Sequence, residues 1–541
     1  MYIVYFVIIM LQLLGMLYWA NVKTNYHIDE LFSMGYAHYY TEASQARYIV
    51  WTEDWQFNEW LDNAELKKYL CISEGQEIYS LPFIKAIVNF FVANDNHSGL
   101  LNFAESLAGY QTVSKWPGIA LNICIFLLAE VILIALLTRL KLSKWSIALF
   151  LTMFGFCGYM ISLVEFIRFY LLVMLFALVM ILLHSVIWTS DKAWKIVVCE
   201  IGSFVMAHLG LKNSELMVVY AGALMGCFFM ALLFTKQWKK LGVYAMVLPM
   251  ALIYLACCTD WLDILFHIGY YAEAGGDKLS RVTTNIAGIS GGGVATQLIQ
   301  LAKWLVQFLF TEYYFGHRLL TIIWGVFLVC IVFGGIRRIK KINLSGESGF
   351  VAVLVGIWVI YTAFYAIGLS NLRETRYYSL GFITFIIVLW YVIDRLLKQI
   401  PSRGHVLCYG LLTGLTVISC IMPFYTRNVQ YIFEQDKDLI SSLQPYQGTD
   451  VILEPYKSAE DQTLTTTAYD CITLMSDETR IYPIQITEGV YDVETFPEKF
   501  LLWAYVERDI GELIHELETV GYQVEGLPAD HTSQVYICNK P

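Results

Sequence analysis

Long apolar runs separated by short polar connections fill most of this chain up to residue 426. A helix needs about 20 apolar residues to cross the hydrocarbon core of a bilayer. We interpret eleven segments in this way: residues 2–20, 116–138, 144–163, 166–188, 195–211, 213–234, 241–259, 318–336, 349–369, 377–396 and 405–424. The pattern predicts a polytopic α-helical membrane protein of about eleven transmembrane helices.

The first apolar segment is short enough to be compared with a signal peptide. It has no basic region ahead of its apolar stretch and no small-residue cleavage site behind it, and both are typical of a cleaved signal. We therefore expect residues 2–20 to be a retained transmembrane helix.

Lysine and arginine are concentrated in every second connection between these helices. They are Arg139, Lys141 and Lys144; Lys192 and Lys195; Lys236, Lys239 and Lys240; Arg337, Arg338, Lys340 and Lys341; Arg395, Lys398 and Arg403. Cytoplasmic loops carry such an excess, so the N-terminus is expected in the cytoplasm. An odd number of helices then places the C-terminus and the loops 21–115 and 260–317 outside a multi-pass cell-membrane protein.

Residues 427–541 have the pattern of a small extracytoplasmic α/β domain behind a transmembrane module, residues 1–426. "DVILEP" and "QVYICN" alternate as strands do, and "VERDIGELIHELETVGY" has helical spacing and ends at Gly521. Loop 21–115 is long enough to carry its own structure, and "NEWLDNAELKKYL" and "PFIKAIVNFFVAN" predict short helices there. The loop 260–317 contains the amphipathic "VATQLIQLAKWLVQFLF".

Composition agrees with the membrane class and limits the partners. Hydrophobic residues make up 57% of the chain and charged residues 15%, with a mean hydropathy of +0.55. The segment 427–541 has 21 acidic and 7 basic residues, a net charge of about −14. This argues against nucleic acid and against docking on an anionic lipid surface.

The twelve cysteines lie mostly in apolar segments, where cysteine behaves as a small hydrophobic residue. Cys471 and Cys538 share the C-terminal domain, and whether they pair is left open. No CxxC or His/Cys pattern with zinc spacing occurs.

Charged side chains within or at the rim of a membrane bundle are costly, so each is a candidate for function. The predicted topology places five pairs at outer helix ends or in outer loops: Asp29/Glu30, Asp95/His97, Glu165/Arg168, His208/Lys212 and Arg373/Arg376. They are expected to converge on one extracytoplasmic cavity. Glu130 and Glu200 lie deeper and receive no functional interpretation.

"YHIDELFSMGYA", directly after the first helix, resembles the Asp-Glu motif of the GT-C glycosyltransferases, and in particular the bacterial protein O-mannosyltransferase and aminoarabinose-transferase group. "NDNHSGLLNFAESL" resembles that group's D-x-H-P-P-L-Y-Y helix through Asp95, His97 and Leu100, with Ser98 and Gly99 in place of the prolines. "VEFIRFYLL" is similar to E-A-R-M-Y-A-L through Arg168 and Tyr170, although Glu165 is one residue further from the arginine.

Two later stretches add to the resemblance. "MAHLGL" is similar to Y-T-H-Y through His208 alone, and "ETRYYSL" resembles the R-Y-L signature through Arg376 and Tyr377. The matches are scattered over residues 25 to 380, and it is their order and their expected outer position that make the combination informative.

The resemblance implies an inverting transfer of a monosaccharide from a polyprenyl-phosphate donor to an extracytoplasmic protein, polymer or lipid acceptor. Asp29 would be the general base, with Glu30 orienting it or the acceptor. Arg168 and Arg376 would bind the donor phosphate, helped by Tyr170. The remaining expected substrate-binding residues are Asp95, His97, Glu165, His208 and Tyr377.

Simpler interpretations stand beside these. The acid pair 29–30 could be solvated loop, Arg168 could pair with Glu165 one helical turn away, and Arg376 could be an interfacial anchor. Asp95 and His97 could be a satisfied polar pair. No cofactor is expected with certainty; acid pairs attract divalent cations, but the sequence defines no ligand set. "GISGGG" at 288–293 lacks the context of a nucleotide-binding loop.

Three rival functions stay open at this point. An oligosaccharide ligase or polymerase would need a larger cavity than a monosaccharide transferase. A lipid-linked glycan flippase or transporter would often show repeated halves with interrupted helices, and no repeat is visible here. A catalytically inactive scaffold would not need the Asp-Glu pair.

Overall fold

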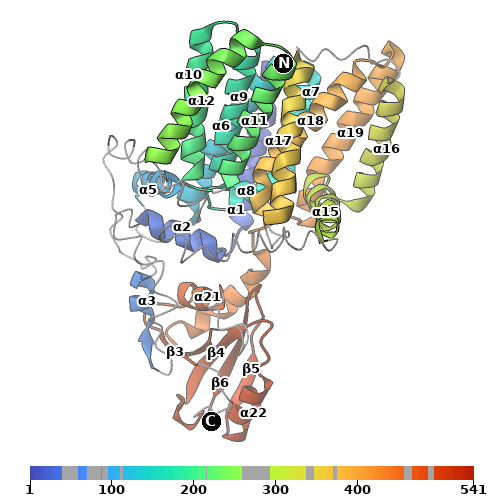
Figure 1. Ribbon diagram of the computed structural model, residues 1–541. Helices are drawn as coiled ribbons and strands as arrows, with labels where there is room; N and C mark the ends of the chain where they lie inside the picture. The colour runs from blue at the N-terminus through green and yellow to red at the C-terminus, as the bar shows by residue number, and fades with distance from the viewer. Residues whose placement is uncertain are drawn as a thin grey trace. The chain divides into compact units, whose positions relative to one another are not determined.

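The structure is a computed structural model that describes residues 1–38, 59–69, 84, 87, 90, 96–109, 114–214, 216–258, 293–336, 346–368, 375–455, 466–484 and 493–541. These residues form two compact units (Figure 1). The helical unit contains Met1–Met16, Asn122–Val164 and Phe169–Val429. The mixed unit contains Leu17–Leu121, Glu165–Arg168 and Gln430–Pro541. The chain passes between them inside three helices and at two further points.

Long helices make up the helical unit. In chain order they are α1 (Tyr2–Val22) and α6 (Lys115–Arg139), both shared with the mixed unit, then α7 (Lys144–Phe156), α8 (Gly158–Glu165), α9 (Tyr170–Thr189), α10 (Ala193–Leu211), α11 (Leu216–Phe234), α12 (Trp238–Cys258), α15 (Gly293–Trp304), the π-helix η3 (Leu305–Tyr314), α16 (Arg318–Ile336), α17 (Glu347–Gly368), the 3-10 turn η4 (Thr375–Tyr378), α18 (Ser379–Leu397) and α19 (Ser402–Thr426). The predicted helical fold class is confirmed.

Eight helices among the described residues are long and apolar enough to cross a membrane, and up to ten if each of two bent pairs counts as one span. The predicted span 241–259 coincides with α12, which is helical over 21 residues but is not among those eight. The count of eleven therefore stays a prediction.

The predicted span 144–163 is not one straight helix. It breaks at Cys157 into α7 and α8, which are bent by 53°. Ser143 caps α7 by accepting the backbone N–H of Ser146. A Cβ on Gly158 would lie 2.5 Å from the backbone oxygen of Asn428, so a glycine at the break lets another chain segment approach closely.

The predicted span 166–188 begins later than its apolar pattern suggested. Helix α9 starts at Tyr170, and the residues before it form a tight turn in which Arg168 N donates to Phe166 O at 2.7 Å. Hydropathy alone could not locate this turn, because Phe166, Ile167 and Phe169 are as apolar as the helix that follows. Arg168 consequently lies outside the regular helix.

The amphipathic segment predicted in loop 260–317 is helical, as expected. It forms α15 and continues as the π-helix η3, and the following α16 turns from this segment by 104°. Residues 259–292, which include "GISGGG" apart from Gly293, lie outside the described residues.

Buried polar side chains tie the helices of this unit together in pairs. The hydroxyl of Tyr220 and Thr384 Oγ1 are 2.7 Å apart, Trp390 Nε1 donates to the hydroxyl of Tyr314 at 2.9 Å, and Gln12 Nε2 donates to Leu151 O at 2.7 Å. Buried polar groups cost free energy unless they are hydrogen-bonded. Each pair therefore joins two helices that apolar contact alone would hold less specifically.

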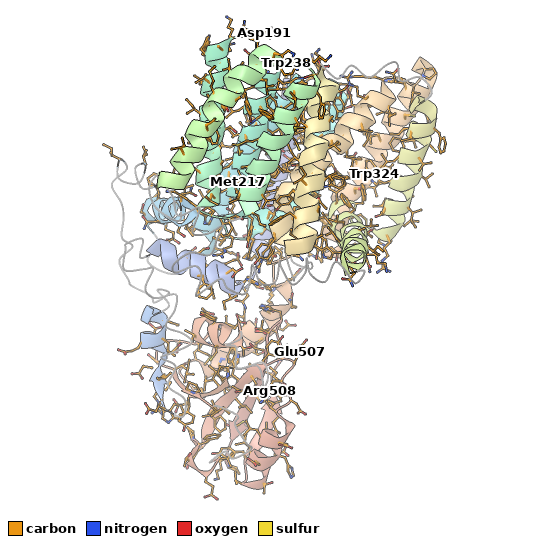
Figure 2. The ribbon with its side chains drawn as sticks, in the orientation of Figure 1. Asp191, Met217, Trp238, Trp324, Glu507 and Arg508 are labelled. Carbon is orange, nitrogen blue, oxygen red and sulfur yellow. The ribbon has the colours of Figure 1, made fainter. Side chains whose placement is uncertain are left out.

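Those basic connections that the structure describes gather at one end of the helical unit. Lys398 Nζ donates to Lys141 O at 2.8 Å, and Lys240 Nζ donates to Trp188 O at 2.7 Å. Glu347 forms ion pairs with both Lys141 and Arg395. Figure 2 shows Asp191 and Trp238 at this end and Met217 toward the other. Basic residues at this end, among those that the structure describes, agree with the proposed topology.

A six-stranded sheet organises the mixed unit. Its strands are β1 (Leu61–Asp62), β2 (Val451–Glu454), β3 (Arg480–Pro483), β4 (Lys499–Tyr505), β5 (Gln523–Gly526) and β6 (Ser533–Asn539), in the order β1-β3-β2-β4-β6-β5. The central strand β2 pairs in parallel with β3 and β4, and the other three strand pairs are antiparallel. The predicted strands "DVILEP" and "QVYICN" correspond to β2 and β6.

Several short helices belong to the same unit. They are α2 (Ile28–His38), α3 (Asn63–Tyr69), α5 (Asn96–Ala108), η5 (Glu434–Asp436), α20 (Lys437–Ser442), η6 (Gln444–Tyr446), α21 (Thr466–Leu474), η7 (Val493–Thr495) and α22 (Gly511–Thr519). The predicted helix of the C-terminal domain is α22. It ends as a Schellman motif, with Gly521 at a φ of +97° and Tyr522 N donating to Leu517 O.

Loop 21–115 contributes directly to this sheet. "NEWLDNAELKKYL" forms the edge strand β1 and then helix α3, where only a helix was predicted. Asn63 Nδ2 donates to three carbonyls, of Ile472, Met475 and Ser476. The Arg480 guanidinium lies over the Trp60 ring at 4.9 Å. "PFIKAIVNFFVAN" lies outside the described residues except for three positions.

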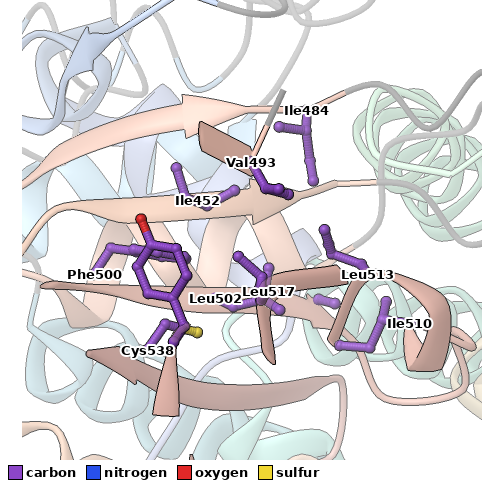
Figure 3. Packing of buried hydrophobic residues seen from close by; sticks show 11 residues of the cluster. Ile452, Ile484, Val493, Phe500, Leu502, Ile510, Leu513, Leu517 and Cys538 are labelled. Atoms are coloured by element: carbon purple, nitrogen blue, oxygen red, sulfur yellow. The ribbon is translucent and has the colours of Figure 1, made fainter. Parts of the chain in front are cut away.

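Helix α22 covers one face of the sheet (Figure 3). Leu513 and Leu517 pack with Ile452, Phe500 and Leu502 of the strands in one buried cluster. Burying a side chain of this size stabilises a fold by about 1.5–3 kcal/mol. Cys538 belongs to the same cluster, and Cys538 and Cys471 are both buried free thiols.

We predict that the C-terminal part of the chain lies outside the cell and the basic end of the helical unit inside. Glu525 and Lys239 are both exposed. In intact cells, a membrane-impermeant thiol reagent should label a Glu525→Cys variant and should leave Lys239→Cys unlabelled until the cells are lysed. The opposite pattern would reverse the topology.

Candidate functional site

Helix α2 carries the acid pair and begins with a reciprocal cap. His27 Nδ1 accepts the backbone N–H of Asp29 at 3.1 Å, and Glu30 Oε2 accepts the backbone N–H of His27 at 2.8 Å. This is close to a capping box, with histidine in the place usually taken by serine or threonine and with its side chain accepting the N–H of the second helical residue and not of the third. The negative charges of the two carboxylates in the first turn also interact favourably with the helix dipole.

Glu30 is the anchor of this helix. Its side chain is completely buried, and Oε2 lies 3.0 Å from Nζ of the equally buried Lys23. Its other oxygen, Oε1, accepts the backbone N–H of Ile167 at 2.9 Å. Burial raises the pKa of Glu30, and the Lys23 ammonium and these two N–H groups oppose that rise. We call the Lys23–Glu30 ion pair the clamp.

The clamp lies where three segments of the mixed unit meet. Lys23 Nζ also donates to Tyr431 O, and Thr24 N donates to Ile432 O at 3.0 Å. The rings of Phe166 and Tyr431 stack 4.0 Å apart, and the His27 ring meets both edge-on. One buried ion pair thus holds the loop before α2, the turn before α9 and the start of the C-terminal segment.

The two acids therefore have different surroundings. The Asp29 side chain is 21% exposed, whereas that of Glu30 is 0% exposed. Both Glu30 oxygens accept hydrogen bonds from the protein, so this carboxylate has little capacity left for a substrate or a metal. Asp29 is the member of the pair that a substrate can reach.

Arg168 approaches the same face of α2. Its Nη1 donates to Ser33 Oγ at 3.0 Å. Ser33 follows Asp29 by four residues, so the two side chains are neighbours on one helix face. The tight turn before α9 thus directs a half-buried guanidinium toward the face of α2 that carries the exposed carboxylate.

Glu165 does not form the ion pair with Arg168 that we considered. No ion pair between these two side chains exists in the described part of the chain. The Glu165 carboxylate is buried without a hydrogen-bond partner, and the cations that act on it electrostatically are Lys23 and Lys115. Glu165 lies next to the clamp. Its direct role in substrate binding therefore stays a proposal.

Helix α5 packs on α2 through Asn102, whose Nδ2 donates to Ala37 O at 2.8 Å. It buries an unusual number of polar side chains: Asn96, His97, Ser98, Asn102 and Glu105. Burial raises the pKa of Glu105 to about 8, so that side chain is largely protonated at neutral pH. His97 is buried at the start of α5, and Asp95 lies outside the described residues.

In the helical unit, three other candidates lie together. The Arg376 guanidinium is 5.2 Å from the Tyr377 ring centroid, and the Tyr377 and Tyr170 rings meet edge-on at 5.6 Å. The hydroxyl of Tyr159 donates to Thr375 O and fixes the η4 turn that carries Arg376. Arg376 is only 7% exposed, which is not the position of an interfacial anchor.

The last candidates are less informative. His208 is half-buried in the final turn of α10, where its carbonyl accepts the backbone N–H of Lys212 at 3.3 Å. Arg373 and Glu374 lie outside the described residues. An apolar groove of about 560 Å³ between α11 and α17, lined by Gly226, Ala352 and neighbouring residues, contains none of the candidates.

Two residues that matter most here were not candidates from the sequence. The sequence does not distinguish Lys23, because a lysine just after an apolar helix normally marks the interface with water. His27 was overlooked because histidine is an uncommon capping residue. The spacing of His27 and Glu30, three residues apart before an apolar run, is the signal that a capping-box search would have found.

Metal-binding capacity lies elsewhere. Within the described residues, the group of side chains close enough to share a cation is Asp436, Asp530 and His531. The acid pair 29–30 is not part of this group. Both oxygens of Glu30 already accept hydrogen bonds from the protein, and this does not support the expected cation at that pair.

We predict that Glu30→Gln destabilises the protein by about 3–5 kcal/mol, because it leaves the Lys23 ammonium buried without a counter-charge. Asp29→Asn should change the free energy of unfolding little, since that carboxylate is partly solvated. Thermal unfolding of the two purified variants in one detergent measures the difference. Equal stability of both variants would show that the clamp does not hold the fold.

No protein-family model and no curated protein sequence matches this chain. The chain is similar to two crystal structures of ArnT from Cupriavidus metallidurans, one bound to undecaprenyl phosphate and one in the apo state. In both cases 98% of this chain and 97% of the ArnT chain are covered, with 9% sequence identity and a TM-score of 0.47. ArnT is an aminoarabinose transferase, and the motifs between residues 25 and 380 resemble the same group. A likeness at this level transfers no residue role, ligand or activity to this chain.

Proposed function

We propose that this protein is an integral membrane glycosyltransferase that moves a monosaccharide from a polyprenyl-phosphate donor to an extracytoplasmic acceptor. The observation that carries the proposal is the arrangement on α2. A partly exposed carboxylate, Asp29, lies on the helix face that the Arg168 guanidinium approaches, while its neighbour Glu30 is buried and holds the helix in place.

The reaction needs few groups. The acceptor's oxygen attacks C1 of the sugar while Asp29 takes the proton from that oxygen. The bond between C1 and the phosphate oxygen breaks, and its electron pair leaves with the polyprenyl phosphate. Attack from the face opposite the phosphate inverts the configuration at C1.

The leaving phosphate gains negative charge as the bond breaks, so a cation placed beside it lowers the barrier. Arginine suits this task because its planar guanidinium can donate two parallel hydrogen bonds to a phosphate. We assign this role to Arg168; for Arg376, which belongs to the helical unit, the role rests on the sequence resemblance alone. Tyr170 and Tyr377 lie beside Arg376, where they can donate to the phosphate or position the guanidinium.

The acceptor binds near Asp29 on the outer side of the membrane in this proposal. The buried polar face of α5, which includes His97, packs with α2 and is our choice for orienting it. A protein, a cell-envelope polymer or a lipid-linked glycan each offers a suitable hydroxyl, and the sugar is not defined by the arrangement.

We predict that Asp29→Asn abolishes turnover and leaves the fold intact. The amide has almost the shape of the carboxylate but is a far weaker base, and general-base catalysis contributes about a hundred- to ten-thousandfold. Purified protein in detergent would be given labelled polyprenyl-phosphate monosaccharides and a solubilised envelope fraction as acceptor. Release of polyprenyl phosphate is the measurement.

Asp438→Asn is the matched control, since Asp438 is an exposed carboxylate of the same unit, and it should keep full activity. Near-normal release by Asp29→Asn would remove Asp29 from the chemistry. Sugar transported across vesicle membranes without any release of lipid phosphate would favour a flippase over a transferase.

A further inference from the structure

Three carboxylates and a histidine lie close together in the mixed unit. Asp436 ends the η5 turn, Asp470 lies in α21, and Asp530 and His531 precede β6. All three aspartates are buried, with 0%, 2% and 7% of their surface exposed. His531 Nδ1 lies 2.7 Å from Asp436 Oδ2. We call these four residues the tail cluster.

One oxygen of the tail cluster is buried and has no hydrogen-bond partner. Asp530 Oδ1 accepts the backbone N–H groups of Thr532 and Ser533, which fixes the carboxylate in the turn before β6. Asp530 Oδ2 is buried and accepts nothing. Leaving a buried charged oxygen without a partner is costly, so this atom indicates a missing ligand.

The charges of the tail cluster are also unbalanced. No lysine or arginine in the described part of the chain forms an ion pair with any of its three carboxylates. His531 can supply at most one positive charge.

We propose that the tail cluster binds a divalent transition-metal cation through Asp436, Asp530 and His531. Their nearest ligand atoms all lie within 4.8 Å of one another. With metal–ligand bonds of about 2.0–2.2 Å, a single cation reaches all three after small shifts. Water fills the remaining positions.

The donor set selects the class of metal. Two carboxylates and one imidazole suit Zn²⁺ or Mn²⁺, whereas Ca²⁺ and Mg²⁺ prefer oxygen ligands alone. The cation replaces the proton held between His531 Nδ1 and Asp436 Oδ2, so binding releases that proton. The Asp530 Oδ2 atom gains its partner at the same time.

Neighbouring side chains already orient these ligands, as outer groups of metal sites do. Asn25 Nδ2 donates to Asp436 Oδ2 at 3.0 Å and to Asp470 Oδ1 at 3.3 Å. Asn25 lies only four residues before Asp29. The bound cation therefore stabilises the loop that leads into α2, independently of which reaction Asp29 performs.

The test uses the full-length protein in detergent after treatment with a chelator. ZnCl2 and MnCl2 are added separately while the unfolding temperature and the bound metal are measured. Mn²⁺ is included because thiolates, which bind Zn²⁺ well, bind Mn²⁺ weakly. We expect stoichiometric binding of at least one of the two metals and a rise of several degrees in the unfolding temperature.

The Asp530→Asn variant distinguishes metal binding by the tail cluster from a purely structural role. Its amide oxygen can keep the two backbone hydrogen bonds, so the metal-free variant should be as stable as the parent or more stable, but it should lose the metal-induced shift. His531→Gln, on a partly exposed side chain, should lose the shift as well. Asp450→Asn, which removes only the surface ion pair with Arg480, should keep it.

The proposal fails if neither metal raises the unfolding temperature of the parent protein. It also fails if Asp530→Asn and His531→Gln retain the full shift, because the metal would then bind elsewhere.

Discussion

The arrangement around α2 depends on one buried ion pair, between Lys23 and Glu30. Two charges removed from water are expensive, and their mutual attraction offsets that cost only with good geometry and further hydrogen bonds. Here those bonds come from backbone groups of separate segments, at Ile167 and Tyr431. The main effect of the ion pair is therefore to specify which segments meet, and its contribution to the overall stability is smaller.

This constraint gives the two residues of the acid pair different functions. Adjacent residues at a helix start cannot point the same way, so one carboxylate turns back into the cap and the other faces outward. Glu30, at the third helical position, has the reach to bond the cap residue His27. Asp29 is shorter and stays partly exposed, and this leaves it available as the base in the proposed transfer.

Much of the fold could be predicted from the sequence, because apolar length and helical spacing are local properties. The positions of most long helices, of β2 and β6, and of the end of α22 at Gly521 followed from such patterns. The turn at Arg168 could not, since apolar residues surround it on both sides. Nor could the edge strand β1, which pairs with a strand more than 400 positions further along the chain.

The candidate site was predictable only in part, for the same reason. Asp29, Glu30 and Arg168 stood out because charge beside an apolar helix is unusual. Their roles depend on partners distant in sequence, such as the loop before α2 and the turn before α9. The tail cluster could not be predicted from the sequence, because its members are separated by up to 95 positions. Single aspartates are also common in an acidic domain and do not by themselves indicate a site.

The central claim is that Glu30 holds the fold whereas Asp29 acts in the chemistry, and the double variant Lys23→Met/Glu30→Gln tests it most directly. Removing both charges avoids an unpaired buried ion, so its unfolding temperature should return toward that of the parent. Polyprenyl-phosphate release per folded molecule should then be close to the parent's. A double variant that is fully folded and inactive would contradict the account, because Glu30 would then be needed for the reaction itself.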